Sequence, residues 1–387
     1  MNSLMVPALL KIPSLGDETS LLYAAKVLLT VAGIETDIQV SRGFGEECGL
    51  ELPGAFIPVG DLREIFSWLT LQYEKDCGLR NGQDRWERPW ISELARDIAS
   101  RIGVTSGIKK KAFQVIITHD VDRTLLCEPF SLCKTILNGL GLMKRECYPV
   151  SAVLDTKAVL RSVERLLQFE VDHGIRSIFF VMSGPFSFAR YGTRYDVRWK
   201  ISREIIKLVQ DTGMLIGLHG SYYATQKDSY GDEKKRLEDV LGQEVVLHRN
   251  HYLHFDPRKT WTQLEKAGFK WDFSVGFNDR MGFRSGVAYT YEAFDLETQE
   301  ELKLRLVPLA FMDGVFAGWP QGETVRKLRD ILEGTKTVGG IVSILFHPDR
   351  FSMRSEAWEL FVRAVEGCED LGAEMGNFKV LRDPGCL

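Results

Sequence analysis

The stretch that decides the fold is "VIITHDVDRT", residues 115–124. Four β-branched residues run directly into a histidine, two aspartates and an arginine. The apolar run predicts a buried strand, whereas carboxylates are costly to bury unless a partner offsets their charge. We therefore ask which group offsets the charges of Asp120 and Asp122 at the end of this strand.

The composition is that of an ordinary globular protein. The chain has 387 residues, of which 44% are hydrophobic and 26% charged, and its formal net charge is −4. This balance argues against a nucleic-acid footprint or a polybasic membrane anchor. The longest apolar stretch, residues 21–34, is interrupted by Lys26 and is too short to span a membrane.

The N-terminal residues and the cysteines indicate where in the cell the protein works. The first residues lack the pattern of a secretory signal, so we expect a cytoplasmic protein. The seven cysteines are scattered, and no CxxC pattern occurs although Cys127, Cys133 and Cys147 fall in one segment. This usage favours reduced thiols over a disulfide or zinc framework.

From residue 113 onward, strand-like runs alternate with amphipathic helical patterns. The expected strands are 113–120, 175–184, 214–221, 244–253, 269–277, 302–313 and 339–349. The expected helices are 158–174, 202–213 with Ser202 as N-cap, 233–242, 260–268, 323–334 and 355–372. About seven such units predict a parallel sheet covered by helices. A closed barrel is favoured over an open doubly wound sheet, because no Gly-rich phosphate turn follows the first strand.

The first part of the chain has a shorter and more mixed pattern. A helix over 20–33, a strand over 36–43, a helix around 61–75 and a Trp-rich stretch over 84–103 predict a small α/β domain of unknown role. The segment "TSGIKKK", residues 105–111, is a plausible boundary. We therefore expect a small domain over residues 1–110 and a barrel over residues 111–387.

Ionisable side chains recur where the expected strands end. They are Asp120 and Asp122, His219 and Ser221, Arg249 and His251, Asp272, Asp313, and His347 and Asp349. One such aspartate is usually a turn former, and one such histidine is usually structural. However, residues two apart share a face of a strand, and functional groups of barrels gather at the carboxyl ends of the strands. The recurrence therefore predicts a functional rim.

The motifs over residues 113–385 resemble those of the polysaccharide deacetylases of the NodB-homology type, a family of carbohydrate esterases. The first family motif, TFDxD, is met by "THDVD", and the ATFFV strand by "SIFFV". The HSxxH motif is met by "HGSYY", the arginine motif by "RNHY" and the final LxH motif by "LFH". The resemblance implies a distorted (β/α)7 barrel that removes acyl groups from N-acylated sugars with the help of a divalent metal.

The resemblance also implies roles for single residues. Asp120 would be the general base, Arg249 would hold it, and His347 would be the general acid. Asp122 and His219 would bind the metal, and the backbone N–H of Tyr252 would bind the oxyanion. Ser221 and Asp272 are further candidates for contacts with substrate or oxyanion. The ligand types suit Zn²⁺, with Co²⁺ or Mn²⁺ as alternatives.

The sequence departs from the family at the second histidine of HSxxH, where Tyr223 stands. A neutral phenol is a poor metal ligand. His251 shares a strand face with Arg249, so we expect it either to complete the metal site or to contact substrate or a backbone carbonyl. His254 is less suited, because its odd offset from Arg249 turns it to the other face.

These features favour a metal-dependent carbohydrate deacetylase acting on a carbohydrate or glycoconjugate. Two other classes remain open at this point. One is a carbohydrate-binding relative without activity, which the missing histidine favours. The other is a glycosyltransferase that uses Asp-x-Asp to hold a metal and a nucleotide diphosphate, which leaves the rim histidines and Arg249 unexplained.

Overall fold

The structure is a computed structural model, and it describes residues 6–13, 18–34, 36–43, 47–76, 85–103, 113–126, 153–316, 320–352 and 355–376. The expected linker 105–111, the boundary between residues 110 and 111, and Cys127, Cys133 and Cys147 lie outside these residues. Cys48 and Cys368, which are described, are buried and form no disulfide. None of the described helices combines the length and the apolar character needed to cross a bilayer.

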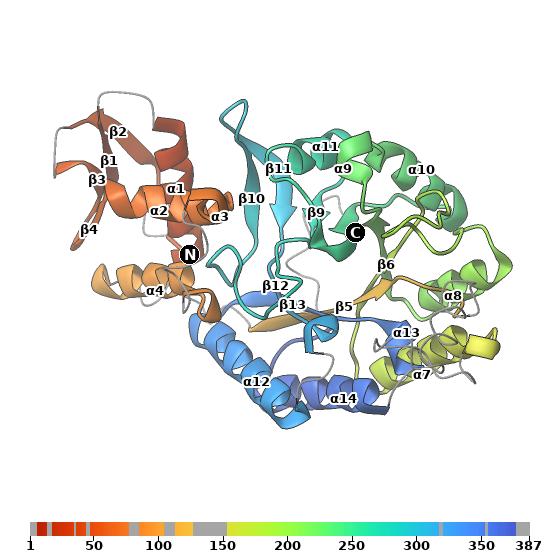
Figure 1. Ribbon diagram of the computed structural model, residues 1–387. Helices are drawn as coiled ribbons and strands as arrows, with labels where there is room; N and C mark the ends of the chain where they lie inside the picture. Colours follow the sequence, from red (N-terminus) through yellow and green to blue (C-terminus); the bar gives the residue numbers. More distant parts are fainter. Residues whose placement is uncertain are drawn as a thin grey trace.

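The larger part of the chain folds into a sheet of parallel strands with helices around its outside (Figure 1). The apolar, β-branched runs form the strands, as expected. Their order is β10-β11-β9-β8-β7-β6-β5-β13-β12, and every neighbouring pair from β11 to β12 is parallel. The parallel strands are β5 (Gln114–Val121), β6 (Ile178–Val181), β7 (Leu215–Gly220), β8 (Leu247–Asn250), β9 (Trp271–Asp272), β11 (Glu300–Leu306), β12 (Leu309–Met312) and β13 (Ile341–Phe346).

The expected sixth strand, 302–313, is divided into two halves at Val307 and Pro308. Proline has no N–H to give to a ladder, so the strand changes partner at this point. β11 pairs with β9 and β12 pairs with β13, and the N–H of Leu309 donates to the carbonyl of Val275 at 2.9 Å. β11 and β12 thus connect the β9 side of the sheet to the β13 side. Because β11 and β12 fill one position, the parallel strands occupy seven positions, which confirms the distorted seven-unit barrel.

The barrel interior is filled with side chains rather than open. Phe180, Trp271 and Phe273 form an inner cluster with neighbouring aliphatic residues. The strand β10 (Tyr291–Asp295) lies outside this barrel and pairs antiparallel with β11. The filled interior means that function is confined to the rim, where the strands end.

The helices each bury one apolar stripe against the strands. They are α7 (Ala158–Asp172), α8 (Lys200–Asp211), α9 (Ala224–Lys227), α10 (Tyr230–Leu241), α11 (Thr260–Lys266), α12 (Gln321–Val338), α13 (Pro348–Phe351) and α14 (Ser355–Asp370). The expectation that Ser202 caps a helix is wrong, because α8 begins at Lys200 and Trp199 is its N-cap. The Ser202 hydroxyl is buried and donates to Thr124 at 3.2 Å.

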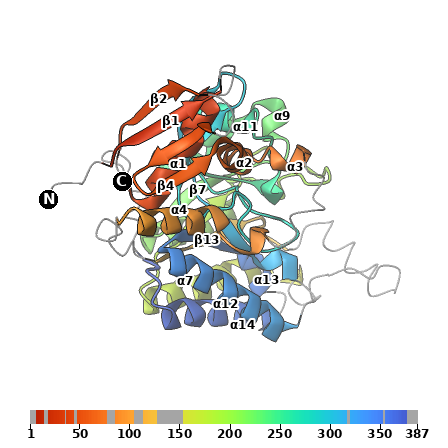
Figure 2. The same ribbon diagram turned by 90° about the vertical axis from the view of Figure 1, so that its left-hand side faces the viewer.

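The N-terminal residues form the expected small α/β domain, which Figure 2 shows from its outer side. Its strands have the order β2-β1-β3-β4. The elements are β1 (Ala8–Ile12), α1 (Glu18–Ala32), β2 (Ile38–Arg42), β3 (Gly49–Leu52), β4 (Ala55–Pro58), α2 (Val59–Leu69), α3 (Tyr73–Asp76), a 3₁₀ turn Arg85–Glu87 and α4 (Trp90–Arg101). The helix expected over 61–75 ends at Leu69. Tyr23 of α1 packs on Phe294 of β10, with ring centroids 4.8 Å apart, so the two domains share one core.

Candidate active site

Three side chains from the ends of three barrel strands meet at the rim. Asp122 follows β5, His219 lies near the end of β7, and His251 begins a 3₁₀ turn, His251–Leu253, after β8. Each offers one potential ligand atom, and these atoms lie within 4.8 Å of one another. Oδ1 of Asp122 is 3.3 Å from Nε2 of His219 and 3.7 Å from Nε2 of His251. The three residues thus form a compact group, which we call the Asp-His-His triad.

The triad fits a divalent cation on two observations. Oδ1 of Asp122 and Nε2 of His219 are buried atoms without a hydrogen-bond partner among the described residues. Such atoms are costly in a native protein and require an explanation, of which an ion is one. In addition, two ligands about 2.1 Å from a tetrahedral metal are about 3.4 Å apart, close to the spacing of these atoms. The donor set of one carboxylate and two imidazoles suits Zn²⁺ and related ions.

The histidines of the triad each turn Nε2 towards Asp122. Nδ1 of His219 lies 3.1 Å from the carbonyl oxygen of Arg249, so Nδ1 carries a proton and Nε2 is the nitrogen left to bind a cation. Burial lowers the pKa of His219, but the charges of Asp120 and Asp122 raise it above the ordinary value, so a cation would compete with a proton for Nε2. Burial lowers the pKa of His251, which favours the neutral imidazole that metals bind. Burial raises the pKa of Asp122, but the neighbouring imidazoles of His251, His219 and His347 hold it well below its usual range.

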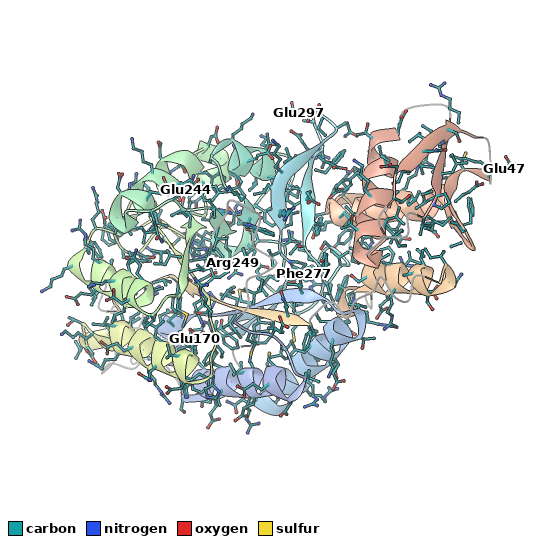
Figure 3. All side chains as sticks on the ribbon, turned by 180° about the vertical axis from the view of Figure 1, so that it is seen from behind. Glu47, Glu170, Glu244, Arg249, Phe277 and Glu297 are labelled. Atoms are coloured by element: carbon teal, nitrogen blue, oxygen red, sulfur yellow. The ribbon has the colours of Figure 1, made fainter. Side chains whose placement is uncertain are left out.

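Asp120 is paired with a fully buried arginine in the middle of the barrel (Figure 3). Nη1 of Arg249 donates to Oδ1 of Asp120 at 2.9 Å and to the hydroxyl of Thr118 at 2.8 Å. Nε of Arg249 donates to the carbonyl of Phe273 at 3.1 Å. The other carboxylate oxygen, Oδ2 of Asp120, is 3.5 Å from Nε2 of His219. Arg249 therefore fixes one oxygen of Asp120 and leaves the other facing the triad.

The sequence "THDVD" puts alternate residues on opposite faces of β5. Thr118, Asp120 and Asp122 face the interior and the rim, whereas His119 turns outward to Glu170 of α7, with Nε2 and Oε1 2.8 Å apart. The alternation of a strand thus separates a structural histidine from the functional aspartates.

His347 approaches the triad from β13 and is oriented by Asp313. Nδ1 of His347 is 2.5 Å from Oδ1 of Asp313, and the backbone N–H of His347 donates to Oδ2 at 3.0 Å. Nε2 of His347 lies 3.8 Å from Oδ2 of Asp122. Burial lowers the pKa of His347, but the charge of Asp313 and its hydrogen bond raise it to about 9. The imidazole therefore carries a proton on Nε2 at neutral pH and presents it to the triad.

Tyr252 lies in a strained turn beside the triad. Its backbone has φ 60° and ψ 14°, and Leu253 follows with φ 51°. Residues other than glycine rarely adopt this conformation, which costs about 1–3 kcal/mol each and persists only where the surroundings enforce it. The ring of Tyr252 is 48% exposed, and His251 packs against it with ring centroids 4.4 Å apart. This turn is therefore accessible to a substrate at the triad.

Two of the predicted site residues are not brought to the triad. Asp272 is paired in register with His248, so it shares the face opposite to Arg249. It is 0% exposed and is bonded by His248 at 2.9 Å and by Ser274 at 2.6 Å. A substrate at the rim therefore does not reach Asp272. The sequence pattern places Asp272 near a strand end but does not fix the face on which its side chain lies.

Ser221 lies after the end of β7, where the alternation of the strand no longer holds. Its hydroxyl donates to Glu233 at 2.6 Å and its N–H to the same carboxylate at 2.9 Å, so it points to α10. Tyr223 does not occupy the position of the missing ligand either. Its hydroxyl donates to the carbonyl of Arg190 at 3.3 Å. The observed partner of Asp122 and His219 is His251.

Sequence reasoning missed the role of Asp313, although it placed this residue at a strand end. The signal was the pairing of β12 with β13, because it puts Asp313, which follows β12, beside His347, which follows β13. It also missed Asn278, whose side chain donates to the carbonyl of Tyr252 at 3.2 Å. No local pattern marks Asn278, because it lies in an irregular segment.

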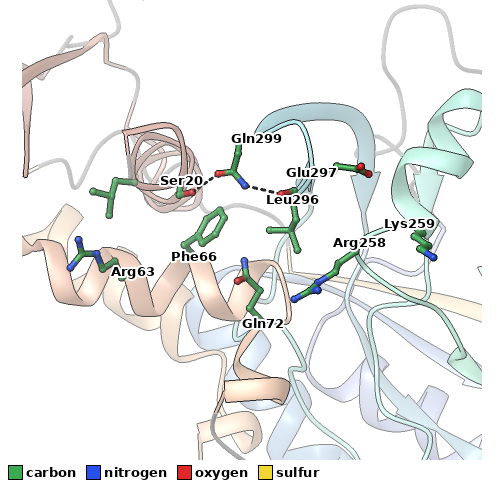
Figure 4. A pocket seen from close by; sticks show the side chains of 10 residues that line it. Ser20, Arg63, Phe66, Gln72, Arg258, Lys259, Leu296, Glu297 and Gln299 are labelled. Atoms are coloured by element: carbon green, nitrogen blue, oxygen red, sulfur yellow. Dashed lines mark hydrogen bonds between the residues drawn. The ribbon is translucent and has the colours of Figure 1, made fainter. Parts of the chain in front are cut away.

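A cavity of about 630 Å³ lies between the N-terminal domain and the barrel (Figure 4). Arg63 and Phe66 of α2 line one side, and Arg258, Lys259 and Glu297 line the other. None of the predicted site residues lines it. The hollow at the domain junction is therefore separate from the triad.

The chain is similar in fold to three solved structures of low sequence identity. A candidate polysaccharide deacetylase from Mycobacterium smegmatis is 18% identical with a TM-score of 0.47, covering 69% of this chain and 87% of its own. The chitin deacetylase of the fungal pathogen Colletotrichum lindemuthianum is 12% identical with a TM-score of 0.38, covering 68% and 84%. The Xyl-CE4 domain of a multidomain xylanase from the hindgut metagenome of Trinervitermes trinervoides is 9% identical with a TM-score of 0.33, covering 67% and 84%. No family model matches the sequence, and no curated protein matches it.

Proposed function

We propose that the protein is a metal-dependent hydrolase that removes an N-acetyl or similar acyl group from a carbohydrate. The observation that carries the proposal is the Asp-His-His triad flanked by an arginine-held carboxylate and a carboxylate-held imidazole. Amide hydrolysis requires an activated water, a stabilised oxyanion and a proton for the leaving amine. These three requirements match the groups around the triad.

Asp122, His219 and His251 would hold the cation, which supplies a bound water of lowered pKa and polarises the acyl carbonyl. Asp120 acts as the general base through Oδ2, the oxygen that faces the triad. Arg249 orients this carboxylate and pairs with its charge, because its guanidinium donates a hydrogen bond to the other oxygen.

His347 acts as the general acid. Asp313 accepts a hydrogen bond from Nδ1–H of His347 and so directs the second proton, on Nε2, towards the space beside Asp122. This proton passes to the nitrogen of the leaving amine when the bond to the acyl carbon breaks. The backbone N–H of Tyr252 is our candidate for stabilising the oxyanion, since the turn that contains it adjoins His251.

The substrate class is an N-acylated sugar or sugar conjugate. The motif order over residues 113–385 supports this class, and so does the tyrosine-rich rim beside the triad. Tyr191 and Tyr222 stack with ring centroids 4.5 Å apart, and Tyr191 meets Tyr252 at 5.0 Å. Aromatic side chains combine an apolar face with a polar tip, which suits the face of a sugar ring and its hydroxyl groups.

The proposal is tested by measuring free acetate released from N-acetylglucosamine oligosaccharides and from small N-acetylated sugar conjugates. Wild-type protein supplied with Zn²⁺, Co²⁺ or Mn²⁺ should release acetate from at least one of them. Asp120→Asn and His347→Ala should each reduce kcat by about 10² or more, because each removes one proton-transfer group. Glycan binding without acetate release would instead support the carbohydrate-binding class.

Two surface changes serve as matched controls. Asp211→Asn neutralises an exposed carboxylate of α8, and His173→Ala removes a half-buried histidine at the end of α7. Both should leave kcat at the wild-type value. If Asp120→Asn and His347→Ala hydrolyse a substrate as fast as these controls, the assignment of base and acid is wrong.

A further inference from the structure

Among the parts of the barrel that the N-terminal domain contacts is an irregular segment, residues 276–288, which we call the bridging segment. The N–H of Phe283 donates to the carbonyl of Trp86 at 2.7 Å, and the N–H of Ile91 donates to the carbonyl of Gly286 at 3.0 Å. The contact is tight, because a Cβ built on Gly282 would lie 2.3 Å from the Trp86 carbonyl oxygen. The N-terminal domain therefore determines where the backbone of the bridging segment lies.

A bidentate ion pair fixes the centre of the bridging segment. Nε and Nη2 of Arg284 donate to the two carboxylate oxygens of Glu74, at 2.7 and 3.0 Å. The hydroxyl of Tyr73 donates to the carbonyl of Arg284 at 2.9 Å. Both side chains of the pair are largely shielded, with 16% and 26% exposed, and the planar fork adds geometric definition as well as energy.

Arg284 also contacts residues on the barrel side of the domain junction. Nη1 donates to the carbonyl of Gly276 at 2.9 Å, where the chain leaves the barrel. The guanidinium lies 5.1 Å from the ring centroid of Phe255 and 5.9 Å from that of Phe277. Phe255 is three residues after Tyr252, and Phe277 lies between the barrel and the N-terminal domain (Figure 3).

The bridging segment touches the strained turn itself through Asn278. The side-chain amide of Asn278 donates to the carbonyl of Tyr252 at 3.2 Å. Two consecutive non-glycine residues at positive φ, Tyr252 and Leu253, hold their conformation only if their surroundings enforce it. The Asn278 bond on one side and the Arg284–Phe255 contact on the other provide two such restraints.

We propose that the N-terminal domain is a positioning element of the candidate site, which acts through Glu74, Arg284 and Asn278 to fix the turn at Tyr252. This inference deepens the proposed function, on which its kinetic consequence rests. Glu74, Arg284 and Asn278 are positioning residues, because they reach the triad only through the turn. The small domain is thus a part of the active-site architecture rather than a separate binding module.

The test compares Glu74→Gln and Asn278→Ala with a matched control, Glu301→Gln. Glu301 pairs with Lys26 at 3.0 Å and so forms another ion pair between the two domains, but on β11 rather than on the bridging segment. Hydrogen–deuterium exchange of a peptide over residues 249–256 reports the turn directly and needs no substrate. Exchange should become at least about tenfold faster in Glu74→Gln and Asn278→Ala and stay unchanged in Glu301→Gln.

The kinetic arm uses acetate release. In the two test variants kcat should fall about tenfold with KM within about twofold, since a small displacement of a reacting geometry lowers rate more than binding. Asn278→Gln keeps an amide donor and should therefore have a higher kcat than Asn278→Ala. If Asn278 served folding alone, the two variants should have the same kcat. Asn278 is exposed, so its substitution does not threaten the fold.

Unchanged exchange over residues 249–256 in both test variants would overturn the inference. Equal acceleration in Glu301→Gln would overturn it as well, because it would reflect general loosening of the two domains. If the wild-type protein releases no acetate, the proposed function fails, while the exchange measurement still decides whether the N-terminal domain holds the turn.

Discussion

The pair formed by His347 and Asp313 gives the most quantitative prediction. Burial lowers the pKa of His347, but the charge of Asp313 and its hydrogen bond raise it to about 9. The ordinary value is about 6.5, so the fold stabilises the protonated imidazole by about 3 kcal/mol at about 1.4 kcal/mol per pH unit. This stabilisation is complete below about pH 6.5 and disappears as the pH rises through about 9.

Asp313→Asn removes the charge and keeps the shape of the side chain. With the main raising influence gone and burial unchanged, the pKa of His347 should fall to the ordinary value or below. At pH 7.5 the protonated fraction would drop from about 97% to about 9% or less, a loss of about tenfold in available general acid. The alkaline limb of kcat/KM should move to lower pH, and lowering the pH to about 6 should recover part of the rate.

The assay that does not depend on substrate is a histidine NMR titration of metal-stripped protein. The chain has seven histidines, and a spectrum of His347→Ala identifies the signal of His347. Asp349→Asn is the matched control, because it neutralises a carboxylate two residues from His347 that contacts Arg123 at 4.0 Å. If His347 in Asp313→Asn still titrates within half a pH unit of its wild-type value, the reasoning about this pair is refuted.

Three further predictions concern the metal, the buried ion pair and the domain junction. Chelation should abolish activity, and Zn²⁺ at about 100 times its Kd should stabilise wild-type protein by about 2.7 kcal/mol but not Asp122→Ala, as measured by thermal unfolding; equal stabilisation of both would place the ion elsewhere. Arg249→Met should lower the free energy of unfolding by about 3–5 kcal/mol, because it leaves the Asp120 carboxylate buried without its cation; urea unfolding checks this, and a loss below about 1 kcal/mol would contradict it. Gly282→Ala should destabilise the protein by about 2 kcal/mol or more, since φ is 129° and the new methyl group would meet the carbonyl of Trp86; an unchanged melting temperature would show that the junction can yield.

The fold was largely predictable because each barrel strand is a run of apolar residues bounded by turns. β5, β7 and β13 were found from such runs, and so was the helix that became α14. The division of the sixth strand was not foreseen, although Pro308 within the run was a signal for it. The strand expected over 269–277 is present but shorter, because only the two residues of β9 pair with β8 and β11.

The candidate site was most predictable where a strand fixes the face of a residue. Asp120 lies within β5 and Arg249 pairs in register with His219 of β7, and the expected proximity of Asp120 and Arg249 agrees with the structure. Ser221 and Asp272 lie away from the triad, because Ser221 bonds to Glu233 of α10 and Asp272 lies on the outward face. Asn278 acts from an irregular segment whose position depends on a domain far away in the sequence, and no local rule foretells it.

The central claim is that one divalent ion held by Asp122, His219 and His251 supports hydrolysis of an acylated sugar. It is tested most directly by titrating metal-stripped protein with Zn²⁺ and measuring acetate release from the N-acetylated substrates at each step. The rate should rise from near zero, level off at one equivalent of zinc, and remain near zero throughout in His251→Ala. Acetate release that is equally fast in metal-stripped protein, or that is unaffected by His251→Ala, would contradict the claim.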